Sequence, residues 1–409
     1  MRSPAGTSRI LMTIWLGYFV ASLDRNTIGI FAVTNDNPEF ETGVTSYNLD
    51  LVYRLRKRFP STKFTIYLSK NNSERFSCVK SENVRVEIVP DFRQLKPRAI
   101  HLLFQKELEW NFFSKIESLH AHKLVIYTVF GLFPYFPAYC YHAHGGRCIS
   151  AIHDIRFLFQ GRKLPFSYIR RKLHDKFFRS ILRSSELLLL PSNHAVKTLN
   201  SLFRSNKYRV SFSVPIKEDV PAPASSLYGD CGDTFFFFPA TAVETKNHVV
   251  LIKAMEMLVT EYPSVRLILT GSNFESTYGR KIKSTIAAAD LKQNIIYLGF
   301  VGEAEKQWLF KNALAAVFPT KNESFNLGIW EAFSYRCPVV TSTDPEMVEQ
   351  VGKAGFLAEV DSPQSLHRAM KLIIENPDIS EELVTHGDQR IKSVRDGALL
   401  SGWGESLDQ

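Results

Sequence analysis

The sequence has little cysteine, and what it has is scattered. The five cysteines are odd in number, and no two of them stand at the spacing of metal ligands. This pattern argues against a disulfide framework and favours reduced thiols. Long apolar runs are also missing, because no segment approaches the roughly 18 apolar residues that a membrane-spanning helix needs. The cysteines are Cys78, Cys140, Cys148, Cys231 and Cys337.

Signatures of nucleic-acid recognition are absent as well. The formal net charge is +9 and the isoelectric point is about 9.2. A positive excess of this kind predicts an anionic partner, and a membrane surface, a phosphate compound and a nucleic acid all remain open. Because the sequence has no RNP or zinc-finger motif, nucleic acid ranks last of the three.

Length and composition predict two globular domains. The chain has 409 residues, of which 45% are hydrophobic and 22% charged, as is typical of globular proteins. This length is too great for one ordinary core and suits two α/β domains of roughly 200 residues each. We place the first domain at 25–217 and the second at 234–390, joined by a linker at 218–233 that is rich in proline, serine and charge. The C-terminal segment 391–409 is expected to cross back to the first domain.

The N-terminal segment 1–24 allows several interpretations. Two arginines precede an apolar stretch from Ile10 to Ser22. That stretch suits the apolar region of a signal peptide, a buried strand, or an extension ahead of the first strand. One observation opposes a glycosylating compartment. Asn322 begins an Asn-Glu-Ser acceptor sequon, and a glycan there would block the candidate site described below.

Strand patterns alternate with helical patterns through both domains. In the first domain, apolar residues at helical spacing from Leu49 to Phe59 predict a helix that Pro60 ends. The alternation predicts parallel sheets with right-handed crossovers, whose ligands bind at the carboxyl ends of the strands. The predicted strands of the first domain are 27–33, 63–68, 84–89, 99–104, 124–130, 148–153 and 186–191. Those of the second are 234–240, 265–271, 295–299, 315–320 and 338–342, with helices over 247–262, 306–313 and 325–335.

The strongest chemical signal is a pair of glutamates in the second domain. Glu323 falls in the turn after the predicted strand 315–320, and Glu331 follows on the next helix with seven residues between them. Carboxylates accept hydrogen bonds from sugar and ribose hydroxyls, and a helix N-terminus can hold a phosphate. This spacing also arises by chance, in which case the two are a loop residue and a solvated helix residue. The position in a doubly wound domain favours the functional interpretation.

The surrounding segments resemble the large retaining family of GT-B glycosyltransferases known as family 4, within the glycosyl transferases group 1. VFPTKNESFNLGIWEAFSYRCPVVTS is similar to the family's E-x7-E segment and the strand that follows it. FFFFPATAVETKNHVVLIKAM resembles its donor-phosphate strand, loop and helix, and YLGFVGEAEKQWLFKNALAAVFPT resembles the segment under the nucleotide base. The resemblance covers 234–372 well and 43–216 more weakly. It implies an α/β fold of GT-B architecture, with two Rossmann-like, doubly wound parallel-sheet domains facing each other across a cleft.

The resemblance implies a role for particular residues. Lys246 would bind the donor diphosphate, since an ammonium suits a pair of phosphates, and Glu331 would bind the ribose hydroxyls. Glu323 would contact the transferred sugar, and His153 would lie near the reacting carbon as the second catalytic residue. Gly43 would lie in a loop facing the donor, because a residue without a side chain lets the backbone approach closely. The remaining donor-binding positions, through their backbone amides, are Ser324, Phe325, Asn326 and Leu327.

Plainer interpretations stay open for three of these residues. Lys246 could be a surface lysine at a helix start, His153 a satisfied core histidine, and Gly43 a turn glycine. The sequence also departs from the family pattern. Ser324 and Asn326 replace the two usual glycines of the motif, the position of a phosphate-binding arginine is Ala240, and Ser-Val-Pro-Ile-Lys at 213–217 replaces an Asn-Gly turn.

The mechanism implied by the resemblance is retaining transfer. The acceptor would attack the anomeric carbon from the face that the nucleotide leaves, and Lys246 with helix-end amides would stabilise the departing diphosphate. The resemblance implies a nucleotide-sugar co-substrate of unknown base, no cofactor and no metal. The sequence has no Asp-x-Asp, the metal–diphosphate motif of the other glycosyltransferase architecture. The acceptor would be a glycan or a lipid-linked molecule.

One segment rich in basic and aromatic residues is relevant to where the protein is located in the cell. Residues 151–180 contain eight lysines and arginines, with six phenylalanines and tyrosines among them. Such a segment suits an anionic membrane surface, or it is a solvated helix whose aromatic residues pack inward. We expect a cytoplasmic protein that contacts the membrane at its periphery. The basic residues are Arg156, Arg162, Lys163, Arg170, Arg171, Lys172, Lys176 and Arg179.

Two alternatives to a hexosyltransferase remain. The first is another GT-B chemistry, such as a sugar-nucleotide epimerase or a phosphorylase-like transferase, although no pyridoxal lysine site is identifiable. The second is a catalytically degenerate GT-B module that serves as a binding or scaffold partner, which the departures from the motif favour. Nucleotide-sugar binding without turnover would distinguish the degenerate module.

Overall fold

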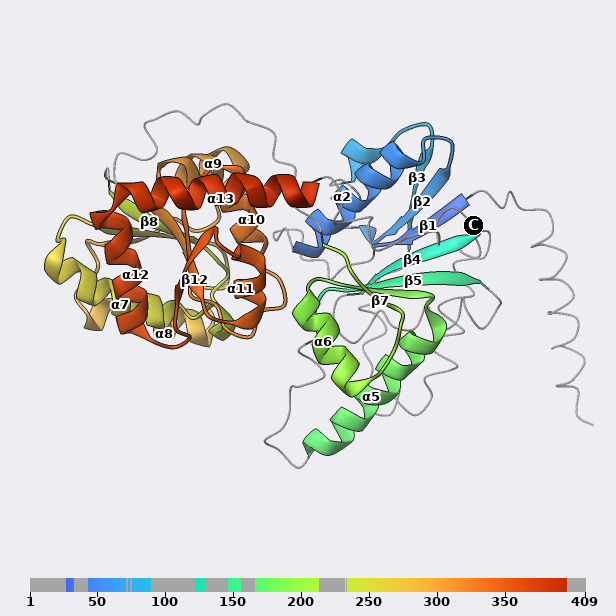
Figure 1. Cartoon of the computed structure of the whole chain (residues 1–409), viewed down its shortest axis with the longest axis horizontal. Coiled ribbons are helices and arrows are strands. Elements are labelled where there is room, and N and C mark those ends of the chain that lie inside the picture. The colour runs from blue at the N-terminus through green and yellow to red at the C-terminus, as the bar shows by residue number, and fades with distance from the viewer. Residues whose placement is uncertain are drawn as a thin grey trace, which may run out of the picture. The chain divides into compact units, whose positions relative to one another are not determined.

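The computed structural model consists of two compact units (Figure 1). It describes residues 27–32, 43–70, 73, 76–89, 122–129, 146–155, 166–212, 232 and 234–395. Unit 1 comprises Met1–Leu190 and Phe203–Arg209, and unit 2 comprises Pro191–Leu202 and Val210–Gln409. A short piece of chain from the N-terminal half therefore packs as part of unit 2.

Unit 1 is built on a seven-stranded sheet within the described residues, in the order β3-β2-β1-β4-β5-β6-β7. The pairings from β3 to β6 are parallel. Its helices include α2 (Gly43–Arg58) and α5 (Phe166–Ser184), and Val52 and Leu55 of α2 are almost fully buried, as their helical spacing predicts. The strands are β1 (Thr27–Phe31), β2 (Lys63–Leu68), β3 (Val84–Ile88), β4 (Leu124–Val129), β5 (Arg147–Ile152), β6 (Leu187–Leu190) and β7 (Tyr208–Val210).

Unit 2 is built on a six-stranded sheet in the order β10-β9-β8-β11-β12-β13, and all its pairings are parallel. The four phenylalanines Phe235–Phe238 of β8 are almost fully buried, because helices cover both faces of the sheet (Figure 1). The strands are β8 (Phe235–Pro239), β9 (Arg266–Thr270), β10 (Ile295–Tyr297), β11 (Ala315–Phe318), β12 (Val339–Ser342) and β13 (Gly355–Ala358).

The helices of unit 2 form two groups. Helix α7 packs against α12 and α8, and α10 packs against α13. The order of the strands explains this division. The chain moves from β8 to β10 in one direction, returns to β11 and then moves in the other direction, so right-handed crossovers place α7 and α8 on one face and α10 and α11 on the other. Helices α12 and α13 follow the last strand and pack against α7 and α10, respectively. The helices are α6 (Asn193–Leu202), α7 (His248–Glu261), α8 (Thr277–Ala288), α9 (Glu303–Asn312), α10 (Leu327–Ser334), α11 (Pro345–Val351), α12 (Pro363–Glu375) and α13 (Pro377–Arg395).

The predicted fold class of two doubly wound parallel sheets is confirmed, and the strand bounds move by a few residues at most. The predicted helix 325–335 begins later, at Leu327, because the side chain of Asn326 caps it. The sequence patterns missed β7, β13, α6, α8 and α11 to α13. The predicted strand 99–104, the segment 1–24 and nearly all of the linker lie outside the described residues. Helix α13 continues through residue 390, where we had placed a boundary, as far as Arg395.

Two further findings concern the cysteines and the apolar character of the helices. Cys148 and Cys337 are buried free thiols, and burial raises the pKa of each to about 12, so both remain protonated at neutral pH. Among the described residues, no helix combines the length and the apolar character that crossing a membrane requires.

Gly279 provides a test of the packing in unit 2. It lies in the first turn of α8, where its amide donates to the capping Ser276 at 3.0 Å. A Cβ at this position would lie 2.1 Å from the carbonyl oxygen of Phe274, and the backbone cannot yield as a flexible side chain would. We expect Gly279→Ala to lower the free energy of unfolding by about 1–3 kcal/mol in urea titration.

Lys281→Ala on the same helix is the matched control, because Lys281 is exposed and its loss should change stability by less than about 0.5 kcal/mol. Equal stability of the two variants would contradict the close packing at Gly279.

Candidate functional site

The loop between β11 and α10 carries the first of the two predicted glutamates. It runs over 319–326, and Asn326 ends it as the N-cap of α10, where its Oδ1 accepts a hydrogen bond from the backbone N–H of Gly328 at 3.1 Å. A Cβ on Gly328 would lie 2.7 Å from the ring of Phe318, so α10 starts close against β11. The loop and the helix start therefore have one defined geometry.

Lys246 and Glu323 form an ion pair across two loops. Lys246 ends the short 3-10 turn Glu244–Lys246 after β8, and its Nζ lies 2.6 Å from Oε2 of Glu323. The side chains are only 21% and 13% exposed. The amide of Lys321 also donates to the carbonyl of Thr245 at 2.8 Å. The structure thus brings together two of the predicted site residues.

The second glutamate has a lysine partner that the sequence did not reveal. Nζ of Lys306, on α9, lies 3.0 Å from Oε1 of Glu331 and 3.0 Å from Oε2 of Glu303. Burial has the largest single influence on the pKa of Lys306 and lowers it, but the charges and hydrogen bonds of Glu331 and Glu303 together raise it above its ordinary value. Lys306 is therefore a cation at any physiological pH.

The other predicted donor-binding residues of unit 2 lie in the same loop or directly after it. Ser324 and Asn326 are almost fully buried, and the ring of Phe325 packs against those of Phe212 and Trp330 with centroids 5.3 and 6.2 Å away. The aromatic contacts anchor the loop at its middle. Leu327 is the first residue of α10.

Helix α11 and its N-cap hold this loop at its middle and at its C-terminal end. Oδ2 of Asp344 accepts a hydrogen bond from the backbone amide of Asn322 at 2.7 Å, and Oε1 of Gln350 accepts one from the amide of Asn326 at 3.0 Å. Asn322 has a φ of 54°, a left-handed conformation that asparagine tolerates better than most residues. The amide of Asn326, one of the predicted backbone donors, is thus engaged by Gln350.

Helix α11 also binds the start of α6. Glu349 accepts hydrogen bonds from the amides of Asn193 and His194 at 2.6 and 2.8 Å, so it caps α6 and its charge suits the positive end of that helix. Ser192 donates to Oε2 of Glu346 at 3.3 Å. Burial raises the pKa of Glu346 to about 8, and the charge of the neighbouring Asp344 adds to the increase.

The sequence contained partial signals for these additional residues. Asp344 followed by Pro345 is a typical helix start, and this pattern would have located α11. It would not have shown that Asp344 reaches Asn322, because that contact joins segments 22 residues apart. Lys306 looks like any lysine in the first turn of a helix.

Gly43 and His153 belong to unit 1. Gly43 is the first residue of α2, after β1, and His153 follows β5. The ring of His153 packs edge-on against that of Tyr47, with centroids 4.4 Å apart, so both predicted residues lie at the carboxyl edge of this sheet. Burial lowers the pKa of His153 to about 4, and its buried Nε2 has no hydrogen-bond partner among the residues that the structure describes. His153 is therefore neutral at physiological pH.

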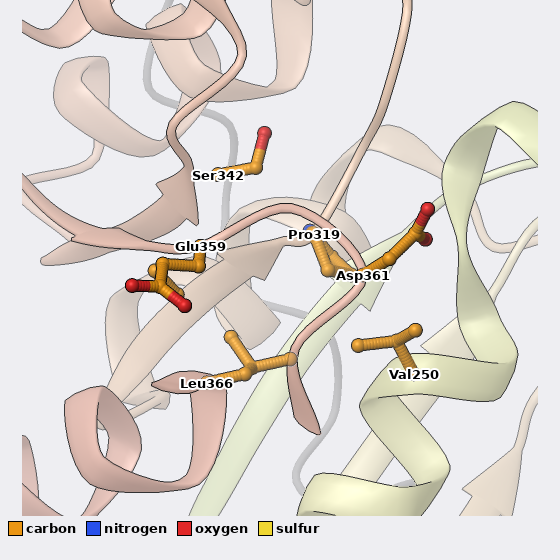
Figure 2. A pocket seen from close by; sticks show the side chains of 7 residues that line it. Val250, Pro319, Ser342, Glu359, Asp361 and Leu366 are labelled. Carbon is orange, nitrogen blue, oxygen red and sulfur yellow. The ribbon is translucent and has the colours of Figure 1, made fainter. Parts of the chain in front are cut away.

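A small hollow lies beside the loop, within unit 2 (Figure 2). It lies at the carboxyl ends of β11, β12 and β13. Asp361 at its rim accepts hydrogen bonds from Asn247 and Lys321, each at 2.9 Å. None of the predicted site residues lines it. The lining residues are Val250, Pro319, Ser342, Ala358, Glu359, Asp361 and Leu366.

Comparison with known proteins gives a family match for the second half. Residues 230–390 match the model of the family described as Glycosyl transferases group 1. D-rhamnosyltransferase WbpZ of Pseudomonas aeruginosa is 24% identical over 234 residues, which are 54% of this chain and 59% of that protein. O-antigen chain mannosyltransferase B of Escherichia coli is 26% identical over 228 residues, 52% of this chain and 57% of that protein. The chain thus spans less than two thirds of these relatives' lengths.

Solved structures share the fold over almost the whole chain. Sucrose-phosphate synthase of Thermosynechococcus elongatus has a TM-score of 0.68 at 14% identity, covering 93% of this chain and 96% of that one. Anabaena HepE in complex with UDP-glucose has a TM-score of 0.68 at 15% identity, covering 93% and 98%. These likenesses confirm the GT-B fold that the sequence predicted.

The environment of Glu346 predicts a pH dependence of stability. Its folded pKa of about 8 lies above its ordinary value of 4.5, so between these pH values the folded state binds more protons than the unfolded state. The free energy of unfolding should therefore fall as pH rises through this range. Glu346→Gln keeps the shape and removes the ionisation. We expect this variant to show a flatter decline of melting temperature between about pH 5 and pH 8.

Glu375→Gln is a control for the general effect of removing a carboxylate, because Glu375 is an exposed partner of Lys371 on α12. Parallel pH profiles for the wild type and Glu346→Gln would show that Glu346 is not the group responsible.

Proposed function

We propose that this chain, whose residues 230–390 match the glycosyl transferases group 1, is a retaining glycosyltransferase. It would move a hexose from a nucleotide-diphosphate sugar to a glycan or lipid-linked acceptor in polysaccharide or glycoconjugate biosynthesis. The names of its relatives support this class of reaction, since they include a D-rhamnosyltransferase, an O-antigen chain mannosyltransferase and a phosphatidyl-myo-inositol mannosyltransferase.

The position of the Lys246–Glu323 pair carries the proposal. β8 and β11 are neighbours in the sheet, and the chain changes its winding direction between them. The loops that follow such a pair of strands run to opposite faces and leave room at the carboxyl edge, which is where doubly wound sheets bind nucleotides. Lys246 follows β8 and Glu323 follows β11, so the cation and the carboxylate both lie at this edge.

The proposed roles follow from the chemistry of each group. The Lys246 ammonium would bind the donor diphosphate and stabilise the charge that develops when the diphosphate leaves. Glu323 would accept hydrogen bonds from the transferred sugar, and Glu331 from the ribose. Because Lys246 already contacts Glu323 at 2.6 Å, a donor that brings its phosphates here would meet a lysine whose position is restrained. The proposal requires no metal and no cofactor.

In unit 1, a neutral His153 could exchange hydrogen bonds with a sugar hydroxyl near the reacting carbon, since a neutral imidazole has one donor and one acceptor. The unsatisfied Nε2 of His153 supports this role. The acceptor oxygen would attack the anomeric carbon on the face that the diphosphate leaves, so the configuration is retained.

One observation favours the alternative of a degenerate binding module. Ala240, at the position of the family's phosphate-binding arginine, is 7% exposed and offers no side-chain cation. The proposed diphosphate site therefore depends on Lys246 and on backbone donors. A degenerate module would bind a nucleotide sugar without turning it over.

A thermal-shift screen against UDP, GDP, ADP and their sugar derivatives tests the donor site. Ligand at about a hundred times its Kd stabilises a protein by about 2.7 kcal/mol, so we expect one nucleotide to raise the melting temperature clearly. Lys246→Ala should weaken that binding about ten- to a hundredfold, because a hydrogen bond to a charged group contributes about 1.5–3 kcal/mol.

Lys283→Ala is the matched control, since Lys283 also forms an ion pair with a glutamate, Glu275, but on the exposed surface. Binding by both variants as tight as that of the wild type would refute the assignment of Lys246. Binding by the wild type without sugar transfer to any acceptor would support the degenerate module.

We also propose peripheral membrane contact through α5. Lys172, Lys176 and Arg179 are exposed on this helix, and they supply the positive charge that an anionic surface attracts. Phe178 instead points inward, where it is fully buried and packs against Phe203 with ring centroids 4.7 Å apart. Any contact would thus rely on charge at these positions.

Flotation with vesicles containing anionic lipid tests the membrane proposal. Replacing Lys172 and Lys176 by glutamate should weaken binding strongly, since each basic residue near such a surface contributes about 1 kcal/mol. The same replacement of the exposed Lys281 and Lys283 on α8 controls for net charge. Absence of wild-type binding, or equal binding by both charge-reversed variants, would rule out contact through α5.

A further inference from the structure

Lys306 occupies an unusual place for a lysine. It is 18% exposed, and its ammonium lies between two carboxylates, with Glu331 at 3.0 Å and Glu303 at 3.0 Å. Glu331 is itself only 15% exposed. A lysine that served only solubility would extend into water, because its long side chain loses rotamer entropy when it is held.

Further hydrogen bonds restrain this network at the start of α9 and at the end of α10. Helix α9 starts at Glu303, and the amide of Gly302 donates to Oε2 of Glu305 at 2.7 Å, which closes the first turn. Tyr335, at the end of α10, donates to Glu303 at 3.3 Å. Lys306 thus reaches Glu331 from a rigid helix start, and the second carboxylate, Glu303, is held from the α10 side.

A paired ammonium and carboxylate are complementary to a hydroxyl group. A hydroxyl donates one hydrogen bond and accepts others, whereas a carboxylate only accepts and an ammonium only donates. At Lys306 and Glu331 an acceptor and a donor stand 3.0 Å apart at one site. A vicinal diol, such as the 2′- and 3′-hydroxyls of a ribose, is the natural ligand of such a pair.

We propose that Lys306 is a positioning residue that makes nucleotide binding depend on the ribose hydroxyls. It orients the Glu331 carboxylate and donates an N–H to the hydroxyl that Glu331 accepts from. This inference rests on the proposed donor site, in which Glu331 binds the ribose. A site built to hydrogen-bond a hydroxyl discriminates strongly against a ligand that lacks it, because the polar groups of the site are then left unpaired.

The test compares the nucleoside diphosphate that binds best, among UDP, GDP and ADP, with its 2′-deoxy and 3′-deoxy counterparts by calorimetric titration. We expect the wild type to bind the ribonucleotide at least about tenfold more tightly than one of the two deoxy forms. Lys306→Met should reduce that ratio to near one, mainly by weakening binding of the ribonucleotide. Lys306→Arg, which keeps a cationic donor, should retain part of the discrimination.

Lys371→Met is a matched control, because Lys371 also lies between two glutamates, Glu261 and Glu375, on the same unit. It should leave both affinities and their ratio unchanged. If Lys306→Met fails to fold, judged by its melting curve, the comparison of Lys306→Arg with Glu331→Gln serves the same purpose. Glu331→Gln keeps the shape of the side chain and should lose the discrimination.

The possible outcomes distinguish failure of the Lys306 inference from failure of the proposed donor site. Equal loss of ribonucleotide and deoxynucleotide affinity in Lys306→Met, or an unchanged ratio, would show that Lys306 only joins α9 to α10, and the inference would fall while the donor site stands. If the folded wild type binds none of the nucleotides, the proposed donor site fails and this inference fails with it.

Discussion

The reversal of winding between β8 and β11 is the constraint on which the rest of the candidate site depends. Two parallel strands lie side by side, but their following loops leave toward opposite faces of the sheet, so the carboxyl edge between them stays uncovered by either crossover. Lys246, from the loop after β8, and Glu323, from the loop after β11, both lie at this edge. Their attraction is strengthened by their limited exposure, because neighbouring charges that are shielded from water are screened less. The four buried phenylalanines of β8 hold this strand in the core, so the loop that follows it starts at a fixed position.

The loop that carries Glu323 must also keep one conformation, although it lacks the glycines that are usual in such a loop. Helix α11 and its N-cap provide this restraint, since Asp344 holds the backbone at the middle of the loop and Gln350 holds it at the C-terminal end. Arg390 in turn donates to the carbonyls of Glu349 and Gln350 at the end of α11, and its guanidinium stands over the ring of Trp330. The shape of the loop is thus set by groups outside it, which is consistent with side chains at Ser324 and Asn326.

The sequence predicted features that depend on neighbouring residues, and it did not predict contacts between residues that are far apart along the chain. The strand at 235–239 was evident, because a continuous apolar run of that length has few alternatives to a buried strand. Glu323 and Lys246 were found through motifs whose spacing is local. Lys306, Asp344 and Gln350 were not, because each acts on a residue that is distant in the sequence, and none has an unusual local pattern. Strand β13 was missed because it is only four residues long, Gly355–Ala358, and periodicity alone cannot assign so short an apolar run to a strand. The roles of Lys246, Glu323, Glu331, Gly43 and His153 all remain predictions.

The placement of α6 has a consequence for anyone who divides the chain. By sequence, the natural cut falls in the proline-rich linker, and α6 would stay with the N-terminal fragment. By packing, residues 191–202 belong to the C-terminal unit, where Glu349 caps α6 and Glu346 receives Ser192. A C-terminal fragment made from the linker onward would lack that partner and leave two carboxylates of α11 facing solvent. Helix α11 also holds the loop of Glu323. A recombinant fragment that folds well could therefore still have a less ordered site. A weak ligand affinity measured on such a fragment would reflect the missing α6 and not the intact protein.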